Sequence, residues 1–437
     1  MQLHATCSEK ATQQQHSTNS CGGTVLSKSI KMDSDDSDND EIQVSRRRRK
    51  RVLFMAMLLK IQQKRFRHLL TLEGRRRRDR RIPRISLVEP SMSPWERLYG
   101  SGNDQALITT AGFDHTAFRE LLVLFEPWFN SYTPWTGSQD GTSFKPLKKK
   151  CGVRRLVDAR TCLGLVLTWY RFRGAEYILQ GWFGFTGTHL NVWLKFGRRG
   201  LTLILWNDPR ARVKMPSDAQ IESYKQVVAA KYSALTDVYS FADGLKLAFE
   251  NCDDLDEQSM FYNGWKSGHF ITNLFVFSVD GRIINCVVNA PGSVHDSTLA
   301  EWGEVYEDLE DAYERTGGKC VVDSAFASND NAFLLKSAQN YNGCSTPLDI
   351  VRCDQATSLR QAAEWGMRAI QAAFPRVKET IPFEESGERR VVLTLLPLLY
   401  NFRLETVGLN QIRNTFCLGW SRDADFFIGV DDVDNDA

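Results

Sequence analysis

The strongest constraint on the fold is an apolar run, FITNLFVFSVDGRIINCVV, at residues 270–288. Two strand-like segments flank Asp280-Gly281, and an Asp-Gly pair between such segments is a strong signal for a tight turn joining antiparallel strands. The run therefore predicts a β-hairpin. Any fold proposed for this chain must contain that hairpin.

Further strand and helix patterns surround the hairpin. The segment VYSFADGLKLAFE, residues 238–250, is interpreted as a first strand pair, and KCVVDSAF, residues 319–326, as a buried strand. Helices are expected over 298–315, 330–338 and 356–373. Strands that alternate with helices predict an α/β domain, which we place at residues 236–410.

A helical region is expected at residues 105–230, ahead of the α/β domain. Three short helical patterns, at 157–173, 175–185 and 186–196, have the layout of a helix-turn-helix, although a plain helical bundle fits the same periodicity. If the third helix contacts DNA, the contacts fall on Thr188, Asn191, Lys195, Arg198 and Arg199.

Charge is concentrated at the ends of the chain. An acidic run at 33–41 precedes the basic runs RRRRKR, 46–51, and RRRRDRR, 75–81. Blocks of like charge repel themselves and seldom pack, so residues 1–85 are expected to be a disordered tail that serves in nuclear import or contacts phosphates. A second, acidic tail is expected at 421–437.

No secretory signal opens the sequence, and the apolar stretch at 52–61 is too short to span a bilayer. We therefore expect an intracellular chain that does not enter a membrane.

Three acidic residues could do chemistry together. Asp243 and Asp323 are each expected at the end of an apolar strand, and Glu364 on a helix with small residues that permit close packing. Neighbouring carboxylates repel, and a divalent cation such as Mg²⁺ relieves that repulsion. Each acid also has an ordinary interpretation, as a turn residue for the aspartates and as a partner of Arg360 and Arg368 for Glu364.

The segment NAPGSVHDSTL, residues 289–299, follows the hairpin directly. By itself it is a Pro-Gly turn with a helix cap at Asp296 and Ser297. Together with FADG and YNGWKSGHF, however, PGSVHDS closely resembles the Harbinger/PIF transposase-derived nucleases of the DDE endonuclease superfamily. The resemblance covers roughly residues 150–405.

This resemblance implies a ribonuclease H-like catalytic domain in which Asp243, Asp323 and Glu364 bind Mg²⁺ or Mn²⁺ and cleave double-stranded DNA. His295 and Asp296 are expected to support these acids without binding the metal, Asp296 by capping the next helix. The resemblance further implies transposon DNA as the substrate, a nuclear location and a Myb-like DNA-binding partner protein, with homo-oligomerisation left open.

Two other functions remain open. The chain could be a domesticated DNA- or protein-binding factor that keeps the fold without catalysis. It could also be a metal-dependent hydrolase of small phosphate esters, which the basic runs disfavour.

Overall fold

The computed structural model describes residues 82–134, 144–147, 157–251, 255–326, 331–337, 346–382 and 386–417. Residues 1–81 of the expected charged tail and the acidic tail at 421–437 lie outside the described residues. None of the described helices is long and apolar enough to cross a membrane.

The N-terminal part of the described chain is mostly helical, as predicted. Its elements are η2 (Arg84–Ser86), η3 (Pro90–Met92), α3 (Pro94–Gly100), α4 (Asp104–Ala111), α5 (His115–Ser131), the short strands β1 (Tyr132–Pro134) and β2 (Phe144–Pro146), α6 (Ala159–Arg171), α7 (Tyr177–Phe183), α8 (Gly187–Asn207) and α9 (Asp218–Lys231).

Regular structure begins earlier than the predicted position near residue 105. The side chain of Ser93 accepts a hydrogen bond from the backbone N–H of Glu96 and so caps α3, while Pro94 occupies the first turn. Trp95 is completely buried against Tyr99 and Phe118. A cap and one buried indole thus fix a helix too short to show sequence periodicity.

The central sheet is mixed. It contains β3 (Val238–Ala248), β4 (Tyr262–Asn263), β5 (Gly268–Ser278), β6 (Ile283–Pro291), β7 (Lys319–Val322) and β8 (Leu334–Lys336). The order is β4-β5-β3-β7-β8, and β6 also pairs with β5. β3, β5 and β6 are antiparallel, whereas β3, β7 and β8 are parallel. The predicted hairpin is confirmed as β5 and β6, while the expected strand pair at 238–250 is one long strand.

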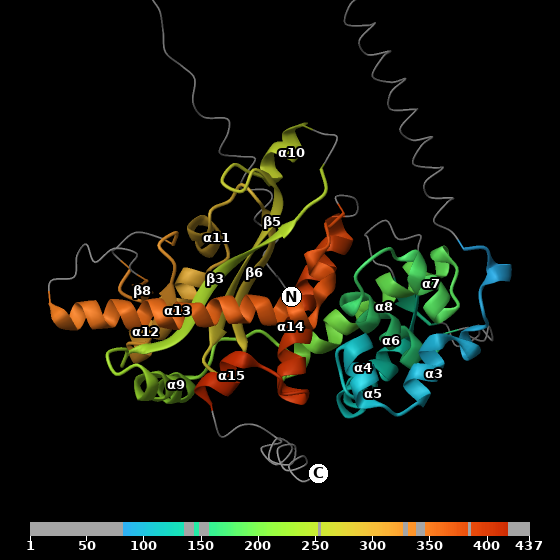
Figure 1. The fold of residues 1–437 in the computed structure, drawn as a ribbon, viewed down its shortest axis with the longest axis horizontal. Helices are drawn as coiled ribbons and strands as arrows, with labels where there is room; N and C mark the ends of the chain where they lie inside the picture. The colour runs from blue at the N-terminus through green and yellow to red at the C-terminus, as the bar shows by residue number, and fades with distance from the viewer. Residues whose placement is uncertain are drawn as a thin grey trace, which may run out of the picture. The chain divides into compact units, whose positions relative to one another are not determined.

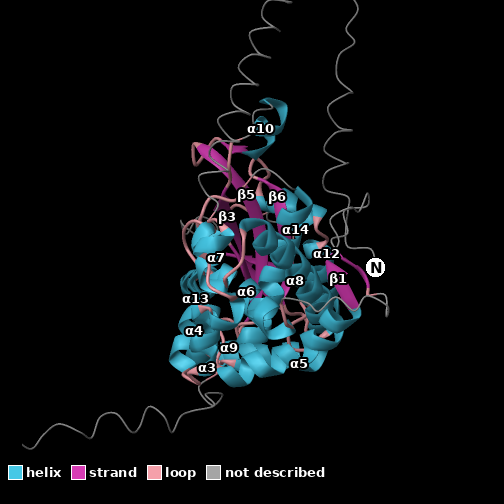
Figure 2. Cartoon of the chain, turned by 90° about the vertical axis from the view of Figure 1, so that its right-hand side faces the viewer, coloured by secondary structure: helices cyan, strands magenta, loops and turns pink. Residues whose placement is uncertain are grey.

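Helices cover both faces of this sheet (Figures 1 and 2). α13 (Pro347–Ala373) and α14 (Ser386–Thr406) lie on one face, where Phe241, Phe277 and Val321 join the core of the helical region. α11 (Asp296–Trp302) and α12 (Val305–Thr316) lie on the other, over Ala242 and Val322. Alternate side chains of each strand thus pack into two separate hydrophobic cores, one on each face of the sheet, because successive side chains of a strand point to opposite faces.

The remaining elements are α10 (Leu255–Phe261), η4 (Pro375–Lys378) and α15 (Gln411–Phe416). The helix predicted at 330–338 is wrong, because Leu334–Lys336 form β8 beside β7. The single acidic helix predicted at 298–315 is broken at Gly303, where a Cβ atom would lie 2.1 Å from the Val287 side chain. The helix predicted at 356–373 is longer, since Thr346 caps it ahead of Pro347.

α14 joins the helical region to the sheet. The buried Asn401 accepts a hydrogen bond from the backbone N–H of Ile283 and donates one to its carbonyl oxygen, both at 2.9 Å. From the helical region, Tyr170 donates a hydrogen bond to the carbonyl oxygen of Val392. Because these groups are buried, losing either side chain would leave backbone polar atoms unsatisfied.

Candidate active site

Asp243 and Asp323 lie level with each other on neighbouring parallel strands. Phe241 of β3 pairs with Val321 of β7, and each aspartate follows that pair by two residues. Adjacent strands lie about 4.8 Å apart, so the two side chains leave the sheet side by side. Asp323 follows the end of β7 as predicted, but Asp243 lies within β3, because pairing with β5 extends β3 to Ala248.

The backbone after each aspartate holds its side chain. The N–H of Gly244 donates to Oδ1 of Asp243 at 2.8 Å, and the N–H of Ser324 donates to Oδ1 of Asp323 at 2.7 Å. Each of these bonds involves Oδ1 alone. The two side chains are therefore oriented by local backbone rather than by a neighbouring cation.

Asp296 reaches the same place from the other face of the sheet. A Cβ atom on Gly244 would lie 2.6 Å from Oδ2 of Asp296 and 2.7 Å from its Cγ. The carboxylate of Asp296 thus occupies the space that a side chain at position 244 would fill. This contact explains why a glycine follows Asp243 at this point.

The predicted capping role of Asp296 is wrong. The N-cap of α11 is His295, whose side chain makes no capping hydrogen bond, and Asp296 is the first helical residue. Oδ1 of Asp296 is buried without a hydrogen-bond donor among the described residues. A buried, ionised oxygen without a hydrogen-bond donor raises the free energy of the folded state unless a cation compensates its charge.

The Pro-Gly turn before His295 positions α11 by close backbone packing. A Cβ atom on Gly292 would lie 2.3 Å from the carbonyl oxygen of Phe270 and 2.5 Å from that of Phe261, so no larger residue fits. The Asn263 side chain donates to the carbonyl oxygen of Gly292 at 2.7 Å. The sharp turn in PGSVHDS therefore sets where Asp296 meets β3.

The carboxyl groups perturb one another. Burial raises the pKa of Asp243 to about 6, the charges of Asp296 and Asp323 add to the rise, and the Gly244 N–H and Arg360 oppose it. Burial also raises the pKa of Asp296, with a further contribution from Asp323. The three aspartates are therefore close enough to interact, which is typical of functional acids.

Nearby cations moderate this repulsion. Lys246, His295 and Lys266 each act to lower the pKa of Asp296. His295 thus lies near Asp296, and its supporting role stays a prediction.

Glu364 lies on α13, beside the sheet but paired with arginines. Its Oε1 lies 3.3 Å from Nη2 of Arg360, and its Oε2 lies 3.9 Å from Nη2 of Arg368. Small residues do permit close packing of this helix, since a Cβ atom on Gly366 would lie 2.6 Å from the ring of Phe277. Arg360, which also acts on Asp243, thus connects Glu364 to the aspartates.

The donor set fits a divalent cation, although the side chains are not gathered around one. Within the described ranges, no three His, Cys, Asp or Glu side chains form a ready metal-holding group. The carboxylates of Asp243 and Asp323 nevertheless provide the hard oxygen ligands that such a cation prefers, and the buried, unsatisfied Oδ1 of Asp296 adds negative charge behind them. Asp243 and Asp323 are the residues that would hold such an ion, with Asp296 behind Asp243.

Two of the basic residues predicted to contact DNA have protein partners. Arg198 is only 6% exposed, and its guanidinium lies 3.7 Å from the ring centroid of Trp169. Arg199 forms an ion pair with Glu388 of α14, with Nη2 to Oε1 at 2.8 Å. The prediction for Arg198 is corrected, because α8 packs this side chain against Trp169 of α6, whereas the DNA contact of the partly exposed Arg199 stays a prediction. Lys195 is half-buried.

Thr188 and Asn191 are exposed near the start of α8. They remain the residues of the predicted DNA-contact set that lie on the surface.

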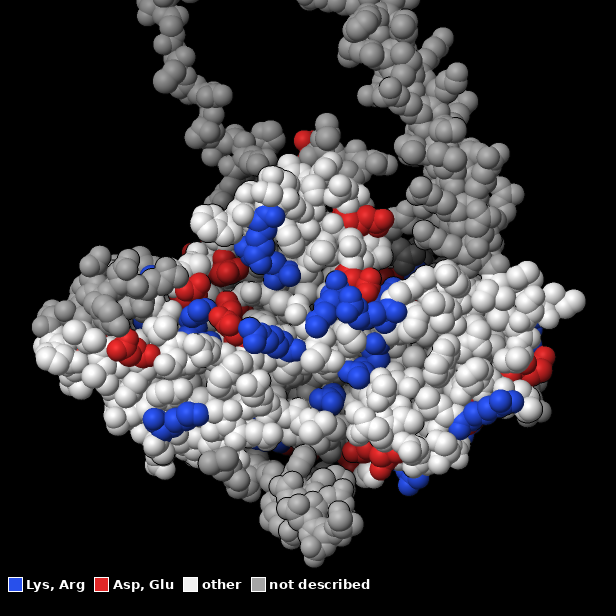
Figure 3. Space-filling model, in the orientation of Figure 1, with Lys and Arg blue, Asp and Glu red and all other residues white. Residues whose placement is uncertain are grey.

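Basic side chains gather instead around the acids. Figure 3 shows a band of Lys and Arg over β3 and the middle of α13 and α14, with acidic groups within it. Lys246, Lys266 and Arg360 belong to this neighbourhood, since their charges act on Asp243 or Asp296. Arg368 adds a side chain that is 76% exposed. We call these four residues the basic rim.

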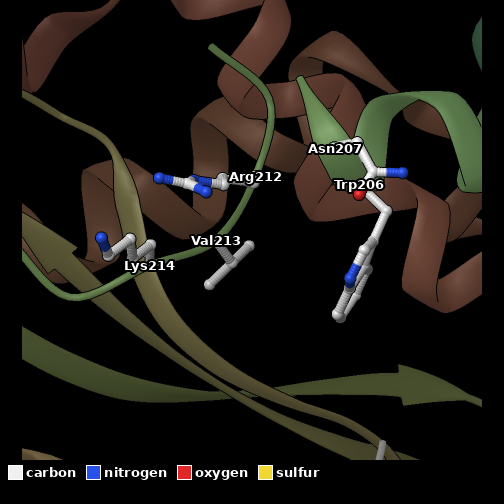
Figure 4. Close-up of a pocket in the computed structure, with 5 residues that line it drawn as sticks. All are labelled: Trp206, Asn207, Arg212, Val213 and Lys214. Atoms are coloured by element: carbon white, nitrogen blue, oxygen red, sulfur yellow. The ribbon is translucent and has the colours of Figure 1, made fainter. Parts of the chain in front are cut away.

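A cavity of about 280 Å³ lies away from the acids. It is lined by Trp206, Asn207, Arg212, Val213 and Lys214, and Figure 4 shows the cationic ends of Arg212 and Lys214 pointing the same way, away from the Trp206 ring. A larger cavity of about 640 Å³ shares Arg212 and Lys214. None of the three aspartates lines either cavity.

Sequence reasoning missed one member of the site, Arg360, which it treats only as a surface partner of Glu364. It places Asp296 in a supporting role but through a helix cap rather than through contact with β3. The available signal for Asp296 was the glycine after Asp243, because a glycine inside a strand often marks the close approach of another group.

Together, the mixed sheet and its clustered carboxylates define the class: an α/β protein with an acidic site that fits metal-assisted chemistry on phosphate esters. In agreement, residues 242–401 match the family model described as DDE superfamily endonuclease. This part of the chain is therefore a DDE superfamily endonuclease domain, for which a ribonuclease H-like fold is expected and the mixed sheet is observed. No curated protein and no solved structure matches the chain.

Proposed function

We propose that this domain cleaves phosphodiester bonds of DNA with a divalent cation held by Asp243 and Asp323. The observation that carries the proposal is the pair of aspartates level on parallel strands, with the buried and unsatisfied Oδ1 of Asp296 behind them. DDE superfamily endonucleases are in general metal-dependent and act on DNA, and the match covers all of these acids.

Each acid has a separate task in this proposal. When bound, the cation activates a water molecule and stabilises the oxygen that leaves. Asp243 and Asp323 provide the ligands that face the substrate, while Asp296, held in place at Gly244, keeps negative charge behind Asp243. His295 and Lys246 limit the electrostatic cost of that charge.

Glu364 is proposed as the third acid, with Arg360 controlling when it is available. Arg360 now pairs with Glu364 and also acts on Asp243. A DNA phosphate is a competing partner for the guanidinium, because arginine binds phosphates bidentately. Substrate binding would therefore release Glu364 toward the aspartates at the moment when a third ligand is needed.

The basic rim is the proposed DNA path. Lys246 and Lys266 provide positive charge near Asp296, Arg360 provides it near Asp243, and Arg368 provides it near Glu364. Contacts of this kind neutralise phosphates without reading sequence, and they weaken steeply with salt. Sequence preference would then come from exposed residues such as Thr188 and Asn191, or from a partner protein.

The finer assignment rests on the PGSVHDS motif. It supports a Harbinger/PIF-type transposase that acts on transposon ends in the nucleus, assisted by a Myb-like partner. The domain limits proposed for this function are a helical region at 105–230 and a nuclease domain at 236–410, preceded by a charged tail that imports the chain or holds DNA.

A non-catalytic DNA-binding factor is the second candidate. It is favoured by one observation, the ion pair that holds Glu364 at Arg360.

Nicking of supercoiled plasmid DNA with Mn²⁺ or Mg²⁺ distinguishes the two. A nuclease should nick DNA only with the cation, and Asp243→Asn and Asp323→Asn should each abolish nicking. The matched control is Asp237→Asn, which removes a carboxylate that pairs with Arg352. Metal-independent nicking, or full activity in both cluster variants, would refute the nuclease proposal; binding without nicking by the wild type would establish the second candidate.

A further inference from the structure

An exposed tryptophan stands at the tip of the β4–β5 hairpin. Trp265 is 94% exposed in the turn of residues 264–267, and its neighbours Met260 and Tyr262 are 44% and 45% exposed. Burying an indole is favourable, so folding alone gives no reason to hold one in water. Such a residue is typical of a surface that binds something.

The turn that carries Trp265 is held by a side-chain hydrogen bond from the preceding strand. The backbone N–H of Lys266 donates to Oδ1 of Asn263 at 3.0 Å, and Ser267 adopts a left-handed conformation with φ of 49°. Asn263 itself is only 8% exposed and belongs to β4, which pairs with β5. Trp265 is therefore presented by a built turn, which reduces the entropy that binding would otherwise cost.

The same turn is tied to the acidic site. Asn263 uses its amide nitrogen to bind the carbonyl oxygen of Gly292, and Ser293 donates its hydroxyl to the carbonyl oxygen of Met260. The charge of Lys266 acts on Asp296. α10 and the start of β5 project beyond the rest of the sheet in Figures 1 and 2. The tip thus forms one border of the surface that carries the acids.

We propose that Trp265 stacks on an unpaired DNA base next to the phosphodiester that is cleaved, while Lys266 pairs with a neighbouring phosphate. The inference rests on the proposed function and names the substrate structure for it. An indole face accepts any base, but bases in a duplex are stacked on each other, so the partner must be a frayed, flipped or single-stranded nucleotide. The adjoining ammonium group favours nucleic acid over an apolar protein surface.

The test measures binding without cleavage, in EDTA, by fluorescence anisotropy. Wild-type protein is compared on a fully paired duplex and on the same duplex with a short unpaired end. Loss of one stacked base should weaken binding by about fivefold to 150-fold. Trp265→Ala should show that loss on the DNA with unpaired bases only, and Trp265→Phe should keep most of the affinity.

Two further readouts make the assignment specific. A 2-aminopurine at the unpaired position should be quenched by the wild type and not by Trp265→Ala. Lys266→Ala should lower the salt dependence of binding by about one phosphate contact without changing the preference for unpaired DNA. The matched control is Tyr177→Ala on α7, which removes an aromatic side chain that is 42% exposed away from the hairpin.

The outcomes separate this inference from the function beneath it. Equal affinity of Trp265→Ala and wild type for both DNAs would overturn the stacking role while leaving the nuclease proposal intact. A change of oligomeric state in Trp265→Ala, measured by sedimentation, would instead make the tip an interface between two copies of the chain. Failure of the wild type to bind any DNA would overturn the proposed function itself.

Discussion

Replacing Asp243 by asparagine is expected to stabilise the metal-free protein. A buried carboxylate beside two others costs free energy, and the substitution removes that charge with little change in volume. The direction of this change in stability follows from the pKa of Asp243, which is about 6 in the folded chain against an ordinary value of 3.8. Protonation therefore favours the folded state, and this contribution, complete below pH 3.8, is lost as the pH rises through about 6.

The size of the effect follows from the same two values. A separation of roughly 2 pKa units at about 1.4 kcal/mol each gives about 3 kcal/mol of destabilisation at pH 7. Asparagine carries no charge and so removes much of this destabilisation, although its amide is still a buried polar group. We therefore expect Asp243→Asn to raise the free energy of unfolding by about 1–3 kcal/mol in EDTA. At pH 4 the variant and the wild type should be nearly equal.

Urea denaturation followed by circular dichroism measures this directly, with and without Mn²⁺. The wild type should gain stability from Mn²⁺ at pH 7, because an ion that binds only the folded state shifts the equilibrium toward it. Asp243→Asn should lose most of that gain. The variant is thus more stable without metal and less responsive to it.

Asp237→Asn is the matched control. Although burial opposes them, Arg352 and Lys319 hold the pKa of Asp237 below its usual range, so its carboxylate stabilises the folded chain. This variant should be destabilised at pH 7 and should keep its response to Mn²⁺. If Asp243→Asn instead loses stability in EDTA while keeping the metal response, the repulsive cluster described here does not exist.

Three other outcomes follow from the structure. Gly244→Ala should change the free energy of unfolding by less than about 1 kcal/mol but weaken Mn²⁺ binding at least tenfold in calorimetric titration, because its methyl group displaces the Asp296 carboxylate. Gly292→Ala should destabilise the protein by about 2 kcal/mol in urea, since two carbonyl oxygens occupy its Cβ position; an unchanged midpoint would contradict that packing. Deleting residues 1–85 should weaken binding to all DNA sequences alike in filter binding, and a selective loss of sequence preference would place recognition in the tail.

The β5–β6 hairpin could be predicted because its signal is local. An Asp-Gly pair between two apolar runs fixes both strands and their turn, and the structure confirms the turn at Asp280 and Gly281. The approximate positions of Asp243 and Asp323 followed from apolar runs that end in acids. What local patterns could not supply was the register, which puts Asp243 inside a strand and level with Asp323.

Residues whose environment depends on tertiary packing were beyond the sequence. Arg198 looked like a DNA contact because basic residues are usually exposed, whereas packing of α8 buries it against Trp169. Asp296 looked like a cap because short polar residues often begin helices, whereas its carboxylate lies on Gly244 across the sheet. The motif identified the right segment, but only the three-dimensional contacts gave its residues their positions.

The metal site at Asp243 and Asp323 is tested most simply by an anomalous difference map from a crystal soaked in Mn²⁺. We expect a peak bounded by the carboxylates of Asp243 and Asp323, next to the side chain of Asp296, and no peak there in crystals of Asp243→Asn. A peak held by other residues, or none in a crystal whose acids are accessible to solvent, would contradict the assignment of this cluster as the metal site.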